Sequence, residues 1–159
     1  MKNIVINTLS SNELFQLTEL FVYHDVDEMI KNNSEQIESG VIDIFVLYID
    51  EKLVGELRVM YSNSDERFAK KGVRAYLYAF RIHIDFRGKG LGKYLLKNVI
   101  DVLSMKGYDE FTVGVEDDNH RAIHIYKDFG FNEIIARIHE EYQGEGYDYN
   151  LYLNKQKVT

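Results

Sequence analysis

Residues 87–92 of the chain read Arg-Gly-Lys-Gly-Leu-Gly and lie between an apolar run and an amphipathic segment. A glycine-rich turn that leads into a helix presents backbone N–H groups that have no partner within the helix. The helix dipole adds partial positive charge at the same end, so such a turn is suited to binding phosphate or pyrophosphate. The residues therefore predict a site for a phosphate-bearing ligand. Their spacing can be compared with the motifs that bind particular ligands of this kind.

The sequence of this turn does not match either of two common nucleotide-binding motifs. A Walker A loop needs a glycine five positions before Gly92 and a serine or threonine after the lysine. The chain has Arg87 at the first of these positions and Tyr94 at the last. A dinucleotide fingerprint needs a third glycine where Lys93 stands, and it belongs in the first strand–helix unit. A mononucleotide-binding regulator that uses the glycine turn alone remains a weaker alternative.

A third pattern, (Arg/Gln)-x-x-Gly-x-(Gly/Ala), is met by Arg87, Gly90 and Gly92. Downstream, after an expected strand, residues 119–131 read Asn-x-x-Ala-x-x-x-Tyr-x-x-x-Gly-Phe. With both patterns in register, the chain resembles the GNAT superfamily of acetyl-CoA-dependent N-acetyltransferases over about residues 42–153. The resemblance implies that the turn holds the pyrophosphate of coenzyme A, and that acetyl-CoA is the cofactor.

The resemblance also assigns roles to single residues. The strand before the turn is expected to pair its backbone with the pantetheine arm, as an added strand would. A backbone N–H at Ile82 would polarise the thioester carbonyl, and Tyr126 matches the tyrosine that protonates the leaving thiolate. Asn119 would touch the pantetheine arm. The cofactor-binding residues implied are Phe80, Arg81, Ile82, Arg87, Gly88, Lys89, Gly90, Leu91, Gly92, Lys93, Asn119 and Tyr126.

The resemblance leaves the general base open. Many relatives place a glutamate on the strand before the turn, where this chain has Tyr78, and others on the following strand, where it has Gly114. Glu116 lies two residues beyond Gly114 and is the base candidate. Glu56, His83 and a chain of water molecules are alternatives. The absent glutamates support a rival hypothesis, a catalytically silent coenzyme A-binding sensor or interaction module.

The expected activity is transfer of an acetyl group from acetyl-CoA to a primary amine of a small molecule or peptide, by direct attack of the amine. Acidic side chains gather in the N-terminal segment, in the loop near 62–72 and in the last hairpin, where Tyr142, Tyr147 and Tyr149 add aromatic faces. This combination suits a cationic acceptor, and it equally suits an ordinary solvated surface. The identity of the acceptor stays open.

Composition limits the class of protein further. The chain has 159 residues, of which 45% are hydrophobic and 28% charged, as in an ordinary soluble globular domain. It has no cysteine, which excludes disulfides, thiolate zinc sites and a cysteine nucleophile, and we expect no metal site. A net charge of −7 argues against general nucleic-acid binding. We expect the amine substrate to be the binding partner of this chain. A homodimer is a candidate assembly.

The apolar runs are far shorter than the roughly 20 residues needed to span a bilayer, so no membrane association is expected. The first residues lack the apolar core of a signal peptide, which predicts a cytoplasmic location. Neither repeats nor linkers divide the chain, so we expect one N-acetyltransferase domain over 1–159, with its core signature at 42–153.

The elements that must position the motif residues follow from hydrophobic spacing. Residues 1–40 are expected to form an N-terminal strand and two helices, and the later segments to alternate between strands and helices. The expected strands cover about 4–6, 42–49, 53–60, 74–85, 111–115, 133–141 and 147–153, and the helices about 10–23, 26–39, 91–107 and 119–130. The helix after the turn is expected to bury Leu91, Tyr94, Leu95, Val99, Val102 and Leu103.

This order predicts an α/β (α+β) fold. With the resemblance it becomes a single-domain GNAT-like fold, with helices on both faces of a central sheet of about seven strands. The sheet is expected to be mixed but mostly antiparallel, with a splay after the fourth strand.

Overall fold

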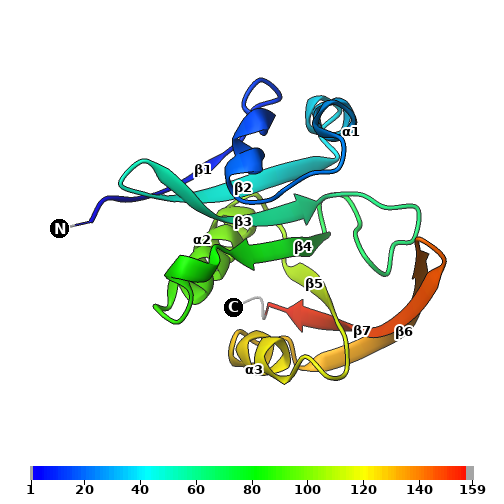
Figure 1. The fold of residues 1–159 in the computed structure, drawn as a ribbon. Coiled ribbons are helices and arrows are strands. Elements are labelled where there is room, and N and C mark those ends of the chain that lie inside the picture. The colour runs from blue at the N-terminus through cyan, green and yellow to red at the C-terminus, as the bar shows by residue number, and fades with distance from the viewer. Residues whose placement is uncertain (1, 157–159) are drawn as a thin grey trace. The chain divides into compact units, whose positions relative to one another are not determined.

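A computed structural model describes residues 2–156 of the chain. Its strands are β1 (Ile4–Thr8), β2 (Ile42–Ile49), β3 (Lys52–Met60), β4 (Arg74–Ile82), β5 (Glu110–Val115), β6 (Glu133–Tyr142) and β7 (Glu145–Lys155) (Figure 1). Its helices are α1 (Val26–Glu38), α2 (Leu91–Met105) and α3 (His120–Asp128), with two 3₁₀ helices, η1 (Leu14–Glu19) and η2 (Ile84–Phe86).

The strands form one sheet in the order β1-β2-β3-β4-β5-β7-β6. The β4–β5 pair is parallel, whereas the pairs β1–β2, β2–β3, β5–β7 and β6–β7 are antiparallel. The expected mixed, mostly antiparallel sheet of seven strands is therefore confirmed. Within the described residues, no helix is both long and apolar enough to cross a membrane.

By its contacts the chain divides into two units, one made of the residues up to Met60 together with Ala79–Asp101, the other of Tyr61–Tyr78 and the residues from Val102 onward. A single domain over 1–159 stays a prediction.

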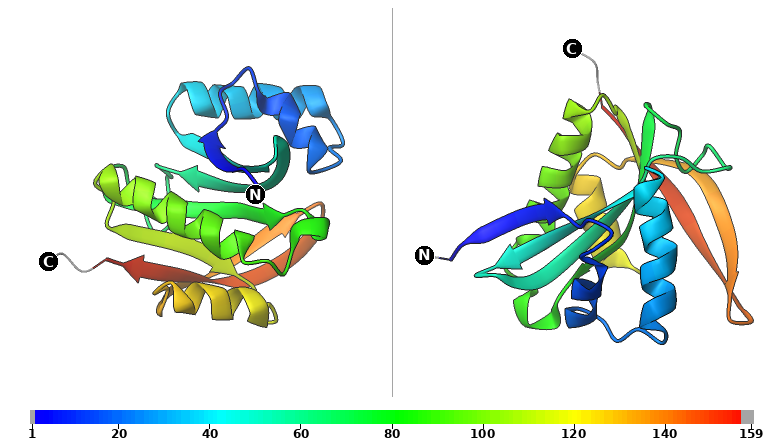
Figure 2. Two further views of the ribbon diagram at one scale, coloured as in Figure 1. Left: turned by 90° about the vertical axis from the view of Figure 1, so that its left-hand side faces the viewer. Right: turned by 90° about the horizontal axis from the view of Figure 1, so that it is seen from above.

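The first unit builds its core between the antiparallel strands β1–β3 and the helices η1 and α1 (Figure 2). Asp25 caps α1, since its carboxylate accepts a hydrogen bond from the Glu28 amide at 3.0 Å. Gly40, with φ of +78°, ends the helix as expected. The buried side chains of this core are Leu9, Leu14, Leu17, Met29, Ile42, Ile44, Val46 and Leu53.

The expected helix at 10–23 is wrong in type and length, because the structure forms only the short 3₁₀ helix η1 there. In a 3₁₀ helix, side chains three residues apart lie one above the other. Leu14 and Leu17 use this spacing to enter the core together, while Phe15 between them is exposed. The expected strand 74–85 is also too long, because β4 ends at Ile82 and η2 follows it.

Helix α2 buries a different stripe from the one expected. Tyr94 and Val102 are 45% and 38% exposed, so these two assignments are wrong. Leu96 and Ile100 are buried in their place, next to Leu91, Leu95, Val99 and Leu103. The buried residues form two rows with a spacing of four, one at 91, 95, 99 and 103 and one at 96 and 100. The second row turns the buried face of the helix toward the side carrying Leu96.

In the second unit, β5 lies between β4 and β7, and β6 and β7 run side by side as a long hairpin (Figure 2). The hairpin turns at Gln143 and Gly144, both with positive φ, as a type I′ turn requires. Its turn is tighter than the expected connection at 144–146. The core cluster of this unit contains Phe68, Ile138, Tyr149 and Leu151.

The register between β4 and β5 ends at the pair formed by Leu77 and Val113, although β4 continues to Ile82. β5 keeps pairing with β7 as far as Val115. Ala79, with φ of +50°, interrupts the extended conformation of β4 just after the last pair. A non-glycine residue rarely adopts this region, so Ala79 marks a local irregularity of the strand at the place where the splay was expected.

Candidate active site

The glycine turn of the first unit connects η2 to α2. Gly88 and Gly90 both have φ of +78°, and a Cβ at either position would meet nothing within 4 Å. Glycine is therefore required there by backbone conformation rather than by space. The Tyr94 amide donates to the Gly90 carbonyl at 3.1 Å, which closes the first turn of α2. The N–H groups of Leu91 and Gly92 precede this bond, as an anion-binding helix terminus requires.

Cationic side chains surround this turn. The ammonium groups of Lys52 and Lys89 lie 5.4 Å and 5.3 Å from the centroid of the Phe86 ring. Arg87 Nε donates to the Ile82 carbonyl at 2.8 Å, which fixes the turn against the end of β4. These charges and the helix terminus suit a pyrophosphate. Lys52 was not identified from the sequence, because nothing local links the start of β3 to the turn.

The end of β4 packs closely on its neighbours within the same unit. A Cβ at Gly92 would lie 3.4 Å from Phe80 Cζ and 3.8 Å from Ile82 Cγ1. A Cβ at Gly55 in β3 would lie only 2.8 Å from Ile82 Cδ1. Both glycines therefore let α2 and β3 approach the strand segment to which the resemblance assigns the pantetheine arm. The structure thus brings the residues assigned at 80–82 and 87–93 together.

Two of the alternative base candidates, Glu56 and His83, hydrogen-bond to other groups of the protein. Glu56 is fully buried, and its Oε1 accepts from Arg81 Nε at 2.7 Å and its Oε2 from Arg58 Nε at 3.1 Å. His83 caps η2, since its Nδ1 accepts from the Asp85 amide at 3.2 Å. Because both side chains have these structural partners, we do not assign either of them the role of base.

Asn119, Tyr126 and Glu116 belong to the second unit. Asn119 caps α3, and its side-chain oxygen accepts from the Ala122 amide at 3.2 Å. Tyr126 is half-buried, with its ring 5.4 Å from that of Phe131. Burial raises the pKa of Tyr126 above its usual value near 10, so the phenol keeps its proton at neutral pH, as a proton donor must. Glu116 lies just past the end of β5 and is exposed.

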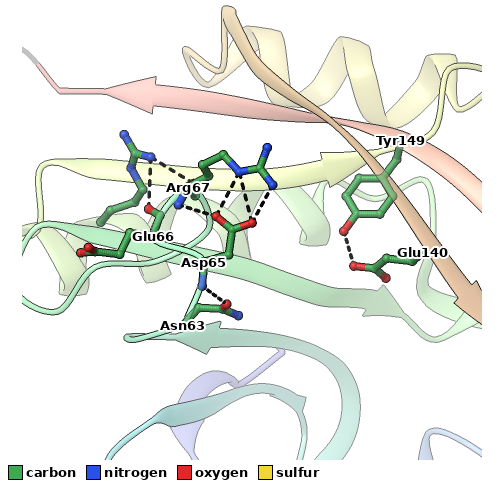
Figure 3. A network of polar contacts seen from close by, with 7 residues as sticks. Asn63, Asp65, Glu66, Arg67, Glu140 and Tyr149 are labelled. Carbon is green, nitrogen blue, oxygen red and sulfur yellow. Dashed lines mark hydrogen bonds and ion pairs between the residues drawn. The ribbon is translucent and has the colours of Figure 1, made fainter.

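A tyrosine ring occupies the space above Gly114. A Cβ on this glycine would lie 2.5 Å from Tyr149 Cε2, closer than atoms pack. The Tyr149 hydroxyl points to Glu140 and donates to its Oε1 at 2.6 Å (Figure 3). The Tyr147 hydroxyl donates to the other carboxylate oxygen at 2.7 Å. Burial, with the Glu140 charge as a second cause, raises the pKa of the neighbouring Tyr76 to about 12.

Comparison with known proteins identifies the family. The model of the acetyltransferase (GNAT) family matches residues 11–131, about three quarters of the chain, and the chain therefore belongs to this family. A curated relative, the [ribosomal protein bS18]-alanine N-acetyltransferase of Salmonella typhimurium, is 36% identical over 63 residues. This match covers 40% of the chain and 43% of the relative, so the chain spans less than half the length of that relative.

Solved structures show the same fold over nearly the whole chain. A dodecameric spermidine N-acetyltransferase from Vibrio cholerae superposes with a TM-score of 0.74 at 20% identity, covering 96% of this chain and 94% of that one. A putative acetyltransferase from Salmonella typhimurium, solved with its cofactor acetyl-CoA, gives a TM-score of 0.69 at 18% identity, covering 99% and 96%. At these identities the likeness extends to the fold alone.

Proposed function

We propose that the chain is an acetyl-CoA-dependent N-acetyltransferase that acts on a primary amine. The observation that carries the proposal is the turn at the N-terminus of α2, where Gly88 and Gly90 adopt left-handed conformations beside Arg87, Lys89 and Lys52. These residues fit a pyrophosphate by shape and by charge. Membership of the acetyltransferase family supports acetyl-CoA as its source.

In this proposal each residue of the chain has a distinct task. Acetyl-CoA, when bound, supplies the thioester from which the acetyl group passes to the amine. The residues at 87–93 hold the phosphates, and the backbone of 80–82 holds the pantetheine arm. The N–H of Ile82 donates to the thioester carbonyl oxygen, a contact whose loss typically costs about 3–4 kcal/mol of transition-state stabilisation.

Two proton transfers complete the proposed reaction. Tyr126 gives its proton to the departing thiolate. Glu116, which is exposed to solvent, takes the proton that the acceptor amine releases. Asn119 touches the pantetheine arm with the part of its amide that does not cap α3.

The proposed acceptor is an amine of a small molecule or peptide. Support comes from the relatives, which are named for an alanine of a ribosomal protein and for spermidine. The carboxylate of Glu140, beside the rings of Tyr147 and Tyr149, adds a local feature that attracts cations. We further propose that the protein acts in the cytoplasm, and that a homodimer is one assembly open to it.

The test is a panel of primary amines incubated with acetyl-CoA while free coenzyme A thiol is measured. The chain has no cysteine, so its own background in a thiol assay is low. We expect turnover on at least one amine, and a Tyr126→Phe variant should lose about 10²–10⁴-fold in kcat while it still binds acetyl-CoA.

The rival hypothesis, a silent coenzyme A-binding sensor or interaction module, predicts binding of acetyl-CoA without turnover on any amine. Full activity of Tyr126→Phe with unchanged cofactor binding would reject Tyr126 as the acid and leave the rest of the proposal standing.

A further inference from the structure

Three charged side chains of the first unit form a network that contains more positive than negative charge. Glu56 is 0% exposed and pairs with two arginines, Arg58 at 3.1 Å and Arg81 at 2.6 Å. The three side chains together carry a net charge of +1. Holding unbalanced charge away from water is costly, so a site of this kind favours the approach of an anion.

The two arginines differ in their surroundings. Arg58 is held from three directions, since its guanidinium also donates to the oxygens of Asn33 at 3.3 Å and Tyr23 at 3.4 Å, and its side chain is 11% exposed. The Arg81 side chain is 31% exposed. The accessible share of the positive charge therefore lies on Arg81, while Arg58 and Glu56 form its buried support.

The Arg81 guanidinium is held in a fixed orientation. Its Cζ lies 3.2 Å from the centroid of the Phe21 ring, so the ring covers one face of the group. Its Nε donates to Glu56 Oε1 at 2.7 Å, and its Nη2 forms an ion pair with the same oxygen at 2.6 Å. A guanidinium has five N–H donors, which is more than its contacts with Glu56 use. A planar cation oriented in this way is suited to a carboxylate.

The position of Arg81 connects this cation to the proposed reaction. Its neighbours in sequence, Phe80 and Ile82, direct their side chains toward Gly92. Side chains alternate along a strand, which places the Arg81 guanidinium on the opposite side of β4 from the glycine turn. The backbone of the same three residues is the segment proposed to hold the thioester arm.

We propose that Arg81 binds a carboxylate carried by the acceptor, so that the acceptor class is an amine with a nearby carboxylate, as in an amino acid. The inference rests on the proposed function, because it concerns the acceptor of that reaction. Arg81 is here a specificity-determining residue, and Phe21 and Glu56 position it.

The experiment compares acceptors that differ only in the carboxylate. Each set contains an amino acid, its carboxamide and the corresponding decarboxylated amine, and kcat/KM is measured for each by thiol release. We expect the amino acid to exceed the other two by about 10- to 100-fold, the range for a charge-assisted hydrogen-bonded pair. Peptides with an amidated C-terminus and an aspartate or glutamate side chain distinguish a side-chain carboxylate from the α-carboxylate. Equal kcat/KM for all acceptors overturns the inference.

Variants test whether Arg81 is responsible. Arg81→Gln should reduce the ratio of kcat/KM between amino acid and decarboxylated amine to about one, and Arg81→Lys should retain part of it. The ratio is taken within one preparation, so a loss of folded protein cancels. Arg67→Gln is the matched control: it removes an exposed arginine, paired with Asp65 at 2.7 Å in the second unit, and should leave the ratio unchanged.

For Glu56→Gln the inference predicts the opposite change in the ratio of kcat/KM between the amino acid and the decarboxylated amine. This substitution removes the negative charge of the network, so the ratio in favour of the amino acid should rise by about 3-fold or more. A purely structural role of the network would lower activity on both acceptors alike. A ratio that stays the same in both Arg81→Gln and Glu56→Gln contradicts the inference.

A binding measurement separates this inference from the proposed function. N-acetyl amino acids and their carboxamides are added with coenzyme A, and the midpoint of thermal unfolding is measured for the wild type and for Arg81→Gln. Preference for the acid in the wild type alone supports the inference even when no amine is turned over, and in that case only the proposed function fails. Equal shifts from acid and amide overturn the inference.

Discussion

At the level of single residues, Gly114 is a position where the ring of Tyr149, from another strand, leaves no space for a side chain. According to the family resemblance, some relatives carry a catalytic glutamate at this position of β5. The ring of Tyr149 lies over it, with its Cε2 only 2.5 Å from where a Cβ would be, and its hydroxyl bonds Glu140. The chain thus has a tyrosine and a carboxylate from the last hairpin where a glutamate side chain would otherwise have to fit.

Gly114→Ala is therefore expected to destabilise the protein by about 1–3 kcal/mol, the usual range for overpacking a well-packed site. Chemical denaturation gives the free energy of unfolding for this variant and for the wild type. In a Tyr149→Ala background the same substitution should cost much less, and the double-mutant cycle measures that coupling. An equal cost in both backgrounds would contradict the steric explanation.

At the level of helices and strands, some features of the fold are determined by the local sequence and others are not. The glycine turn, the start and end of α1 and the ends of the strand β2 lie where hydrophobic spacing and the glycine at the end of α1 predict them. The type of η1 and the buried side of α2 were missed, because both depend on which neighbours each helix meets. The partners of Glu56 were missed for the same reason, since Arg81 is 25 positions away in the chain.

Asn119 combines two roles that one substitution can separate. Its side-chain oxygen caps α3 by accepting from the Ala122 amide at 3.2 Å, and its amide is proposed to touch the pantetheine arm. Asn119→Asp keeps a capping oxygen, so stability should stay within about 0.5 kcal/mol, whereas Asn119→Ala should cost about 1 kcal/mol. Titration calorimetry with acetyl-CoA should show the dissociation constant of Asn119→Asp raised by about 3- to 10-fold.

Asp25→Asn supplies the matched control for this pair of roles. It exchanges the same two side chains at the cap of α1, where the carboxylate accepts from the Glu28 amide at 3.0 Å. It should leave both stability and acetyl-CoA affinity close to those of the wild type. If Asn119→Asp binds acetyl-CoA as tightly as Asp25→Asn does, Asn119 acts only as a cap.

For the whole molecule, the cationic turn stands out against the overall charge. The chain carries a net charge of −7, yet Lys52, Arg87 and Lys89 gather at the end of one helix. A local excess of positive charge in an acidic protein points to a specific anionic ligand rather than to general attraction of polyanions. Ligand binding at this turn should therefore be selective, and its effect should be measurable on the stability of the whole chain.

Acetyl-CoA at about 100 times its dissociation constant should add about 2.7 kcal/mol to the free energy of unfolding. For a chain of this size that corresponds to a rise of roughly 5–11 °C in the unfolding midpoint, which calorimetry measures directly. ATP and NAD at the same concentration should give little shift, and a larger shift from either would favour a nucleotide-binding protein. If the chain is a single domain, one transition moves as a whole, with equal calorimetric and van't Hoff enthalpies. Two transitions, of which only one responds to acetyl-CoA, would instead mean that the two units unfold separately.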